Sequence, residues 1–365
     1  MNRLALKLRF CAAFLLLGLW GADAQTAREQ IAAVPERAGG IYHSYEYRPA
    51  AAAPAPDGYT PFYISHYGRH GSRYHSSEKA YDRPLSVLLQ ASEAGKLTPK
   101  GQEVLAKVEA LAADAYLRYG DLSPRGTAEH RGIAERMYAA WPEVFSTDGG
   151  RVCRVESRST LVPRCILSMA AFNERLKELN PAITTTRDAS GRYLDYMARG
   201  NSLVLARKAV AAVADSLSRA RLNPDRLVRS LVTDPRTVAE PLELMQDLYM
   251  LASIVQDVSH LGIEPFYDIF TDEELYSLWE CENALRYMQM GPSARFGDPI
   301  VADAGALLRN IVETADEVVR GESDLSASLR FGHDTCITPL LALLGVEGAS
   351  TRVESLDDVA AVWNA

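Results

Sequence analysis

The stretch HYGRHGSRYH, residues 66–75, carries three histidines and two arginines and contains no carboxylate. The preceding residues 61–65, PFYIS, have the aromatic and β-branched composition of a short strand. The cationic stretch therefore follows the end of a strand, which is where α/β proteins bind their ligands. Arginine forks pair with phosphate oxygens, and the glycines beside His70 allow close approach of a ligand. The stretch predicts a phosphate-handling site.

Helices and strands alternate in the residues that follow. Apolar residues recur at helical spacing over residues 101–119, and the Ser-Pro pair at 123–124 predicts a second helix that stops near residue 142. Residues 151–157 have the pattern of a strand, and the next helix begins at Arg164. This alternation is typical of a fold with a parallel sheet.

Long helical patterns then occupy residues 173–324, and a short strand at 327–332 ends in His333 and Asp334. The sequence therefore predicts an α/β fold, with a mostly parallel sheet flanked by helices. Its core would be discontinuous, formed by residues 25–172 and 325–365. Residues 173–324 would form a large, mainly α-helical insert domain.

Residues 1–24 have the features of a secretory signal peptide. Three basic residues precede an apolar run over residues 10–20, and an Ala-Asp-Ala pattern ends at Ala24. The apolar run is about half the length that a membrane-spanning helix needs. We expect cleavage between Ala24 and Gln25, a secreted and periplasmic protein, and no stable membrane insertion after cleavage.

The chain is acidic, with a formal net charge of −8. An acidic chain argues against nucleic acid as a partner, because binders of polyphosphate backbones present a basic face. A small phosphate ester would instead be drawn in by a local cationic pocket. No cofactor is indicated, and metal binding is disfavoured because Arg69 and Arg73 lie among the histidines and would repel a cation.

Four cysteines remain after the predicted cleavage: Cys153, Cys165, Cys281 and Cys336. An oxidising compartment would permit two disulfides, with the pairing open. Buried free thiols are an equally good interpretation. The spacing of the cysteines matches no zinc-binding or CxxC pattern.

Three motifs give the chain a resemblance to a known family. RHGSR at residues 69–73 matches RHGxR, His333-Asp334 matches a C-terminal HD motif, and residues 122–130 resemble an LTxxGxxQ helix start. On these motifs the chain resembles the histidine phosphatase superfamily, branch 2, which contains the histidine acid phosphatases and phytases. The sequence around Arg164 and Cys165 is most similar to that of the multiple inositol polyphosphate phosphatases, a subgroup of this family. The resemblance implies a phosphoglycerate mutase-like fold.

The resemblance also implies a role for each motif residue. His70 would attack phosphorus and form a phosphohistidine, and Asp334 would protonate the leaving alcohol. The phosphate oxygens would be held by Arg69, Arg73, Arg164 and His333. Such a site needs no metal, because positioned cations can neutralise the transferred group. The implied substrate is inositol hexakisphosphate (phytate) or another inositol polyphosphate.

Several alternatives stay open from the residues. Asp334 could be the N-cap of the following helix, and Arg164 could be a surface residue paired with Glu174 or Glu178. His75 stands where the family usually has proline, and His333-Asp334 replaces the HAE of the inositol polyphosphate phosphatases. Family members also continue through further strands beyond the helix at residues 338–344. Either the C-terminal end is truncated, or another part of the protein protects the open edge of the sheet.

Two other functions fit the same motifs. One is a broad-specificity acid phosphatase that acts on sugar phosphates or bisphosphoglycerate. The other is an inactive protein that binds inositol phosphates without hydrolysing them.

Overall fold

The computed structural model describes residues 26–47, 49, 55–198 and 200–364. The expected signal peptide over residues 1–24 lies outside these ranges. No helix within them is both long enough and apolar enough to cross a membrane.

The described residues form one parallel sheet of four strands in the order β1-β4-β2-β3. The strands are β1 Ile64–Arg69, β2 Arg154–Ser159, β3 Thr184–Ala189 and β4 Ala327–Gly332. Arg69 is the register partner of Gly332, and Ser159 is the partner of Phe331. The carboxyl ends of β1, β4 and β2 therefore meet at one edge of the sheet. The predicted parallel α/β fold is confirmed.

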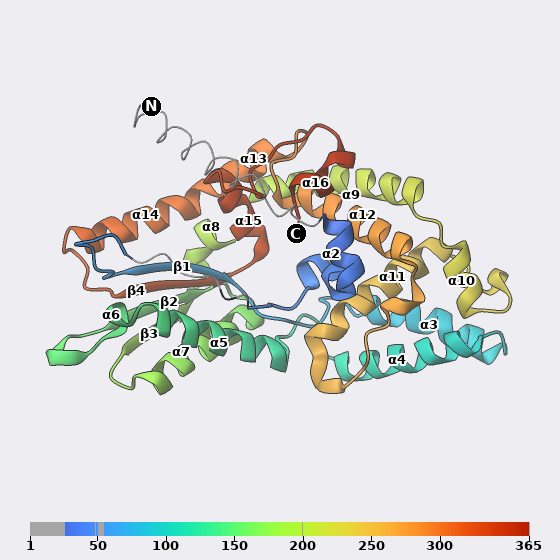
Figure 1. Cartoon of the computed structure of the whole chain (residues 1–365), viewed down its shortest axis with the longest axis horizontal. Helices are drawn as coiled ribbons and strands as arrows, with labels where there is room; N and C mark the ends of the chain where they lie inside the picture. Colours follow the sequence, from blue (N-terminus) through green and yellow to red (C-terminus); the bar gives the residue numbers. More distant parts are fainter. Residues whose placement is uncertain (1–25, 48, 50–54, 199, 365) are drawn as a thin grey trace, which may run out of the picture.

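Helices cover both faces of the sheet (Figure 1). One face carries α5 (Pro124–Ala140), α6 (Pro142–Phe145) and α7 (Pro163–Leu179). The other face carries α8 (Leu194–Met197), α14 (Gly305–Val319) and α15 (Asp334–Leu343). On the first face Phe172 packs against Phe331 with ring centroids 5.5 Å apart. On the second, Tyr67 and Leu340 belong to a smaller apolar cluster.

Most of the other helices form a second body beside the sheet, here called the helical lobe (Figure 1). Its helices are α2 (Ala27–Ala33), α3 (Lys79–Glu93), α4 (Pro99–Ala115), α9 (Asn201–Arg221), α10 (Asp225–Leu231), α11 (Pro241–Ile254) and α12 (Asp272–Met290). The short helices α13 (Gly297–Asp303) and α16 (Val359–Val362) pack against α12.

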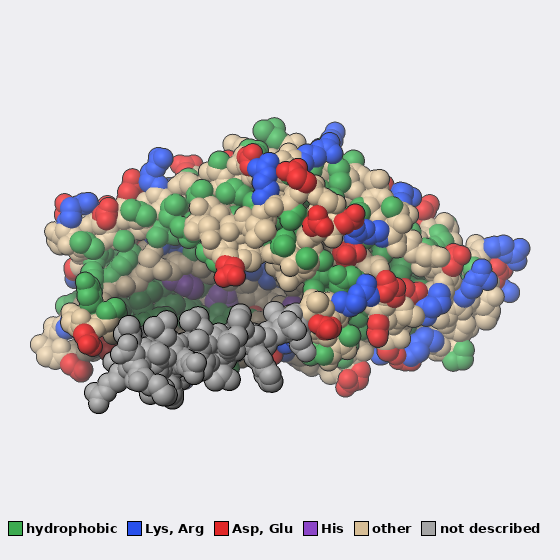
Figure 2. All heavy atoms as spheres, turned by 45° about the horizontal axis from the view of Figure 1, so that its top comes forward, with side chains coloured by type: hydrophobic (Ala, Val, Ile, Leu, Met, Phe, Trp, Pro, Cys, Tyr) green, Lys and Arg blue, Asp and Glu red, His purple; other side chains and the backbone are tan. Residues whose placement is uncertain are grey.

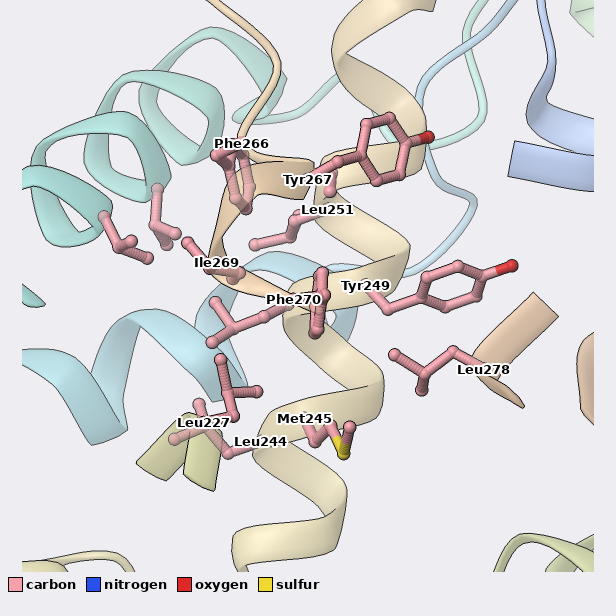
Figure 3. Packing of buried hydrophobic residues seen from close by; sticks show 14 of the residues in the cluster. Leu227, Leu244, Met245, Tyr249, Leu251, Phe266, Tyr267, Ile269, Phe270 and Leu278 are labelled. Atoms are coloured by element: carbon pink, nitrogen blue, oxygen red, sulfur yellow. The ribbon is translucent and has the colours of Figure 1, made fainter. Parts of the chain in front are cut away.

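The largest apolar core of the molecule lies in the helical lobe. Figure 3 shows Leu251 of α11 projecting toward the segment that carries Phe266 and Ile269, and Leu244 of the same helix beside Leu227 of α10. Leu251 and Met245 are fully buried. Each such side chain contributes roughly 2 kcal/mol by leaving water, so the helical lobe is a stable support for whatever it contacts.

The predicted domain boundaries are wrong in two respects. β3 pairs in the sheet and α14 covers it, although both fall inside the predicted helical insert of residues 173–324. Conversely, α3 and α4 pack in the helical lobe, although both fall inside the predicted core segment 25–172. Helical spacing predicts a helix and its apolar face, but it does not say which core that face packs against.

Two element boundaries also differ from the prediction. The strand expected at residues 61–65 is shifted toward the C-terminus. It begins at Ile64, where pairing with β4 begins, and it continues into the cationic stretch as far as Arg69. The helix expected over 101–119 ends at Ala115, and Leu117 beyond it adopts a left-handed φ of 57°. A side chain rarely takes that conformation in a helix, so the helix cannot continue to Gly120.

The four cysteines of the described chain are unpaired and buried. Cys165, beside Arg164, directs its thiol to the Gly332 carbonyl, with a sulfur to oxygen distance of 3.4 Å. The interpretation as buried thiols is therefore the one that this structure supports.

Candidate active site

The loop after β1 is clamped onto the first turns of α5 and α7. The Ser72 carbonyl accepts hydrogen bonds from the Ser123 main-chain nitrogen at 2.9 Å and hydroxyl at 3.0 Å. The Gly71 nitrogen donates to the Ser168 hydroxyl of α7 at 3.2 Å. A Cβ atom on Gly71 would collide with the main chain of Gly126. The glycine after His70 is therefore required by packing.

The hydroxyl of Ser123 also caps α5, where it accepts from the Gly126 nitrogen at 3.2 Å. The predicted Ser-Pro helix start is confirmed. The same serine thus fixes the helix end and the loop that carries His70 and Arg73.

His70 lies at the carboxyl end of β1 with one ring nitrogen left available. Its Nδ1 is 2.9 Å from the Gly71 carbonyl. Because a carbonyl oxygen only accepts, Nδ1 carries the proton and Nε2 keeps its lone pair. Burial and the guanidinium of Arg69 lower the pKa of His70 far below its usual value, so the ring stays neutral. A neutral imidazole with a free Nε2 can act as a nucleophile.

His333 faces His70 from the end of β4. The two ring centroids are 5.5 Å apart in an edge-on arrangement. The His333 main-chain nitrogen donates to the Tyr67 hydroxyl at 3.2 Å, and its Nε2 lies 3.3 Å from the Thr160 hydroxyl. Burial and the charge of Arg164 lower the pKa of His333 to about 4.

Three guanidiniums converge on the same edge of the sheet. Arg73 donates to the Tyr74 carbonyl at 2.8 Å, and Arg164, the second residue of α7, donates to the Gly120 carbonyl at 3.3 Å. Within the described chain, the buried Nε atoms of Arg69, Arg73 and Arg164 have no hydrogen-bond partner. Burial and the charge of Arg73 lower the pKa of Arg164, as expected for clustered cations. These spare donors fit an anion.

The proposed pairing of Arg164 with Glu174 or Glu178 is wrong. Those two carboxylates bind Arg131 instead, at 3.0 Å and 2.6 Å. Arg164 therefore belongs to the cationic cluster and not to the surface of α7.

Asp334 is the first residue of α15, and the N-cap position is taken by His333. One Asp334 oxygen lies 3.1 Å from Arg69 Nε, without the alignment of a hydrogen bond, and the other accepts from the Thr335 nitrogen at 2.8 Å. Burial alone would raise the pKa of Asp334, but Arg69 and Arg286 outweigh it and lower that pKa. Asp334 is therefore ionised in the empty site.

The sequence did not point to Arg286, which acts on Asp334 from the helical lobe. It projects from α12, where its Nε donates to Glu282 at 2.7 Å and its Nη1 donates to Gln289 at 3.0 Å. No motif surrounds Arg286 in the sequence. Its approach to Asp334 depends on how the helical lobe packs against the sheet.

The other histidines of the cationic stretch lie away from the strand-end cluster. His75 is 3 % exposed, and its Nε2 bonds to the Met250 carbonyl of α11 at 2.9 Å. His66 packs against Phe172 on the face of the sheet. Arg158 is not an outer contact of the site, because its guanidinium is held by Glu156 and Tyr196.

A cavity of about 380 Å³ adjoins the loop that carries His70 and Arg73. Its wall includes His43, Tyr45 and Asp257, and Figure 2 shows a hollow with histidine side chains on this molecule. A second cavity, of about 290 Å³, is lined by Arg69 and Asp334. Among the described residues, no three His, Cys, Asp or Glu side chains gather in a way that could hold a metal ion.

Solved structures share this fold. The multiple inositol polyphosphate phosphatase of Bifidobacterium longum, solved with inositol hexasulfate, superposes with a TM-score of 0.73 at 19 % identity over 90 % of this chain and 86 % of that one. The phytase of D. castellii superposes with a TM-score of 0.58 at 18 % identity over 85 % of this chain and 68 % of that one. No curated protein sequence matches the chain.

A protein-family model matches most of the described chain, including the strand-end site. The model of the histidine phosphatase superfamily, branch 2, matches residues 68–364. That range includes the loop after β1, the start of α7 and the His333-Asp334 pair. The chain is therefore a phosphatase that belongs to the histidine phosphatase superfamily, branch 2.

Proposed function

We propose that this phosphatase hydrolyses phosphomonoesters of inositol, with inositol hexakisphosphate and lower inositol polyphosphates as substrates. The observation that carries the proposal is the convergence of a neutral His70 with guanidiniums whose buried Nε atoms have no hydrogen-bond partner in the described chain. Further support comes from the similar Bifidobacterium protein, which is a multiple inositol polyphosphate phosphatase bound to inositol hexasulfate. A highly charged ester suits a densely cationic site.

In the proposed reaction the Nε2 lone pair of His70 attacks phosphorus, and the bond from phosphorus to the ester oxygen breaks. The oxygens of the transferred group lie against Arg69, Arg73, Arg164 and His333. These groups neutralise the charge that the phosphoryl group carries in the transition state. A phosphohistidine and the inositol alcohol result.

Asp334 supplies the proton that the departing alkoxide needs. The carboxyl is ionised in the empty site because Arg69 and Arg286 lower its pKa. A bound phosphate dianion offsets the charge of those guanidiniums, so the pKa of Asp334 rises in the complex and the acid form becomes available. In the second step Asp334 takes a proton from water as that water attacks the phosphohistidine. Phosphate leaves and His70 is restored.

The test compares substrates on the purified mature protein. We expect phosphate release from phytate to be at least about tenfold more efficient, in kcat/KM, than release from glucose 6-phosphate, because phytate offers more phosphates to the cationic site. Equal efficiency would contradict the inositol phosphate assignment and favour a broad-specificity acid phosphatase. Binding of phytate without release of phosphate would contradict catalysis.

We also propose that the protein is exported, with cleavage between Ala24 and Gln25. N-terminal sequencing of protein recovered from the periplasm or medium tests this. The expected first residue is Gln25, and an intact Met1 on the exported protein would contradict it.

A further inference from the structure

Ser72 is held at each of its polar groups. Its main-chain nitrogen donates to Glu129 Oε2 at 2.8 Å, and its hydroxyl donates to Glu129 Oε1 at 2.8 Å. Its carbonyl accepts from Ser123, as described above. Because Ser72 lies two residues after His70 and one before Arg73, fixing Ser72 fixes where both of those side chains begin.

Glu129 approaches this loop from α5. Its side chain is 8 % exposed, and besides Ser72 it accepts from the Tyr45 main-chain nitrogen at 3.1 Å. The Nε atom of Arg125, one helical turn earlier, lies 3.6 Å from Glu129 Oε1. Hydrogen bonds to an ionised carboxylate are shorter and stronger than those between neutral groups. Glu129 therefore holds the loop more firmly than a neutral side chain could.

A second buried carboxylate reaches the same serine from the helical lobe. Asp257 follows α11 in the 3₁₀ segment Val255–Leu261, and it accepts from the Ser44 hydroxyl at 2.9 Å. The Ser44 hydroxyl lies 3.4 Å from the Ser72 hydroxyl. Asp257 and Ser44 are each 3 % exposed. A chain of polar contacts thus runs from α5 through Ser72 and Ser44 to the helical lobe.

The hydroxyl protons of this chain match its carboxylates. Ser44 directs its proton to Asp257, and the Ser72 hydroxyl shares its proton between Glu129 at 2.8 Å and the Ser44 oxygen at 3.4 Å. A buried carboxylate without a closely paired cation costs free energy of folding, because it is removed from water. The hydrogen bonds that it makes must offset that cost. Here both carboxylates are used on the loop that carries the candidate nucleophile.

We propose that Glu129 and Asp257 are positioning residues that hold the His70–Arg73 loop from the two bodies of the molecule. Neither touches the phosphate in this account, and the proposal rests on the proposed function of His70 and Arg73. Glu129 acts directly on Ser72, whereas Asp257 acts through Ser44.

The first test is Glu129→Leu, which keeps the approximate size of the side chain and removes both acceptor oxygens. Glutamine is the residue that the LTxxGxxQ pattern has at this position, and its amide oxygen could still accept from Ser72, so it is not used for the test. Without an acceptor for the Ser72 nitrogen and hydroxyl, the loop shifts. We expect kcat to fall by about 100-fold, because a misplacement of about 1 Å costs that much, while KM for phytate rises only a few-fold. The matched control is Glu135→Leu on the same helix, whose exposed carboxylate pairs with Arg175. The control should retain wild-type kcat.

Asp257→Asn should have a smaller effect, a fall of about tenfold in kcat, because it reaches the loop through one more side chain. Ser72→Ala removes the hydroxyl but keeps the main-chain donor, and it serves where Glu129→Leu does not fold. In the double variant of Ser72 and Glu129, the loss should be well below the product of the single losses, because both act on one contact. Independent, multiplying losses would overturn the proposal.

Affinity for inorganic phosphate, measured by titration calorimetry, separates this proposal from the proposed function. A wild-type protein that binds phosphate but hydrolyses no ester would refute the proposed function. The positioning role would then still be tested by the phosphate affinities of the variants. We expect Glu129→Leu and Ser72→Ala to bind phosphate several-fold more weakly than the control does. Variants with the kcat and phosphate affinity of the control would overturn the positioning role, even if their thermal stability fell.

Discussion

Arg330 inside the sheet and the arginines gathered at the carboxyl edge of the sheet differ in their hydrogen bonds. Arg330, in the middle of β4, is fully buried and has every nitrogen bonded, to Asn310 at 2.8 Å, Ser65 at 3.1 Å and Thr314 at 3.3 Å. At the carboxyl edge of the sheet, Arg69 and Arg164 keep buried nitrogens without a partner in the described chain. Among the described residues, Arg158 and Arg175 also keep a buried Nε without a partner, so a spare nitrogen alone does not mark a ligand site. What distinguishes Arg69, Arg73 and Arg164 is that their spare donors lie together at one edge of the sheet.

Arg69→Met gives the largest expected effect. It removes one clamp on the transferred phosphoryl group, so kcat/KM should fall by about 1000-fold, as for loss of a group that stabilises transition-state charge. The melting temperature should change little, because the lost attraction between Arg69 and Asp334 is offset by the lost repulsion between Arg69 and its cationic neighbours. Steady-state kinetics and calorimetric melting measure the two. A large drop in stability with modest loss of activity would break the comparison.

Asp334→Asn tests the carboxylate that lies beside Arg69 at the carboxyl edge of the sheet. For phytate, a poor leaving group, kcat should fall by about 100-fold, and for 4-nitrophenyl phosphate it should fall much less. Phosphate should bind more tightly, because Arg69 no longer has an anionic neighbour within the protein. Equal kinetic losses on both esters would contradict the role of Asp334 as the acid.

Arg330→Met should reverse the pattern seen for Arg69. The side-chain oxygens of Asn310, Ser65 and Thr314 each lose a buried hydrogen-bond donor. The free energy of unfolding should therefore fall by about 2 kcal/mol. Activity per folded molecule should be unchanged. Denaturant unfolding and kinetics on the soluble fraction provide the measurements. Loss of activity at unchanged stability would show that bonded and free arginines are not functionally distinct.

A pH-dependent effect extends the comparison to histidines. Burial lowers the pKa of His75 from its usual value of 6.5 to about 4. The unfolded chain therefore takes up the proton first, and the stability that neutral His75 contributes is lost as the pH falls from 6.5 to about 4. His75→Gln keeps a donor for the Met250 carbonyl but does not titrate. Between pH 7 and pH 4, wild type should lose about 3 kcal/mol more than the variant.

Asp257 changes stability in the opposite sense. Burial raises its pKa to about 6, so the native state favours the neutral carboxyl, and stability is lost as the pH rises from 3.8 to about 6. Both proteins contain Asp257, so its contribution cancels in the difference. Equal slopes for wild type and His75→Gln would contradict the assignment of His75 as a buried neutral residue.

The sequence predicts the strand-end residues well because parallel strands bring their carboxyl ends together. His70 and His333 are 263 residues apart in the chain and have ring centroids 5.5 Å apart in the fold. Each follows a strand that its own pattern reveals. Pro163 marks the start of the helix that Arg164 opens, whereas the place of Arg164 in the site is implied by the family resemblance. For His70 and His333, local pattern and one topological rule are enough.

Other features depend on contacts that no local pattern carries. β3 is an edge strand of mostly polar, exposed residues, so it lacks the alternation that marks a strand. α3 contains Pro84, which argues against a helix in the sequence. Glu129 meets Ser72, and Arg286 acts on Asp334, only because distant elements pack together. The positioning and electrostatics of the site lie in these tertiary contacts.

The most direct test is to trap the covalent intermediate. Protein mixed with phytate is quenched within milliseconds at alkaline pH, where phosphohistidine survives, and its peptides are examined by mass spectrometry. The account predicts one phosphoryl group on the peptide that contains His70, absent from His70→Ala. Turnover without a phosphorylated peptide, or phosphate on another residue, would contradict it.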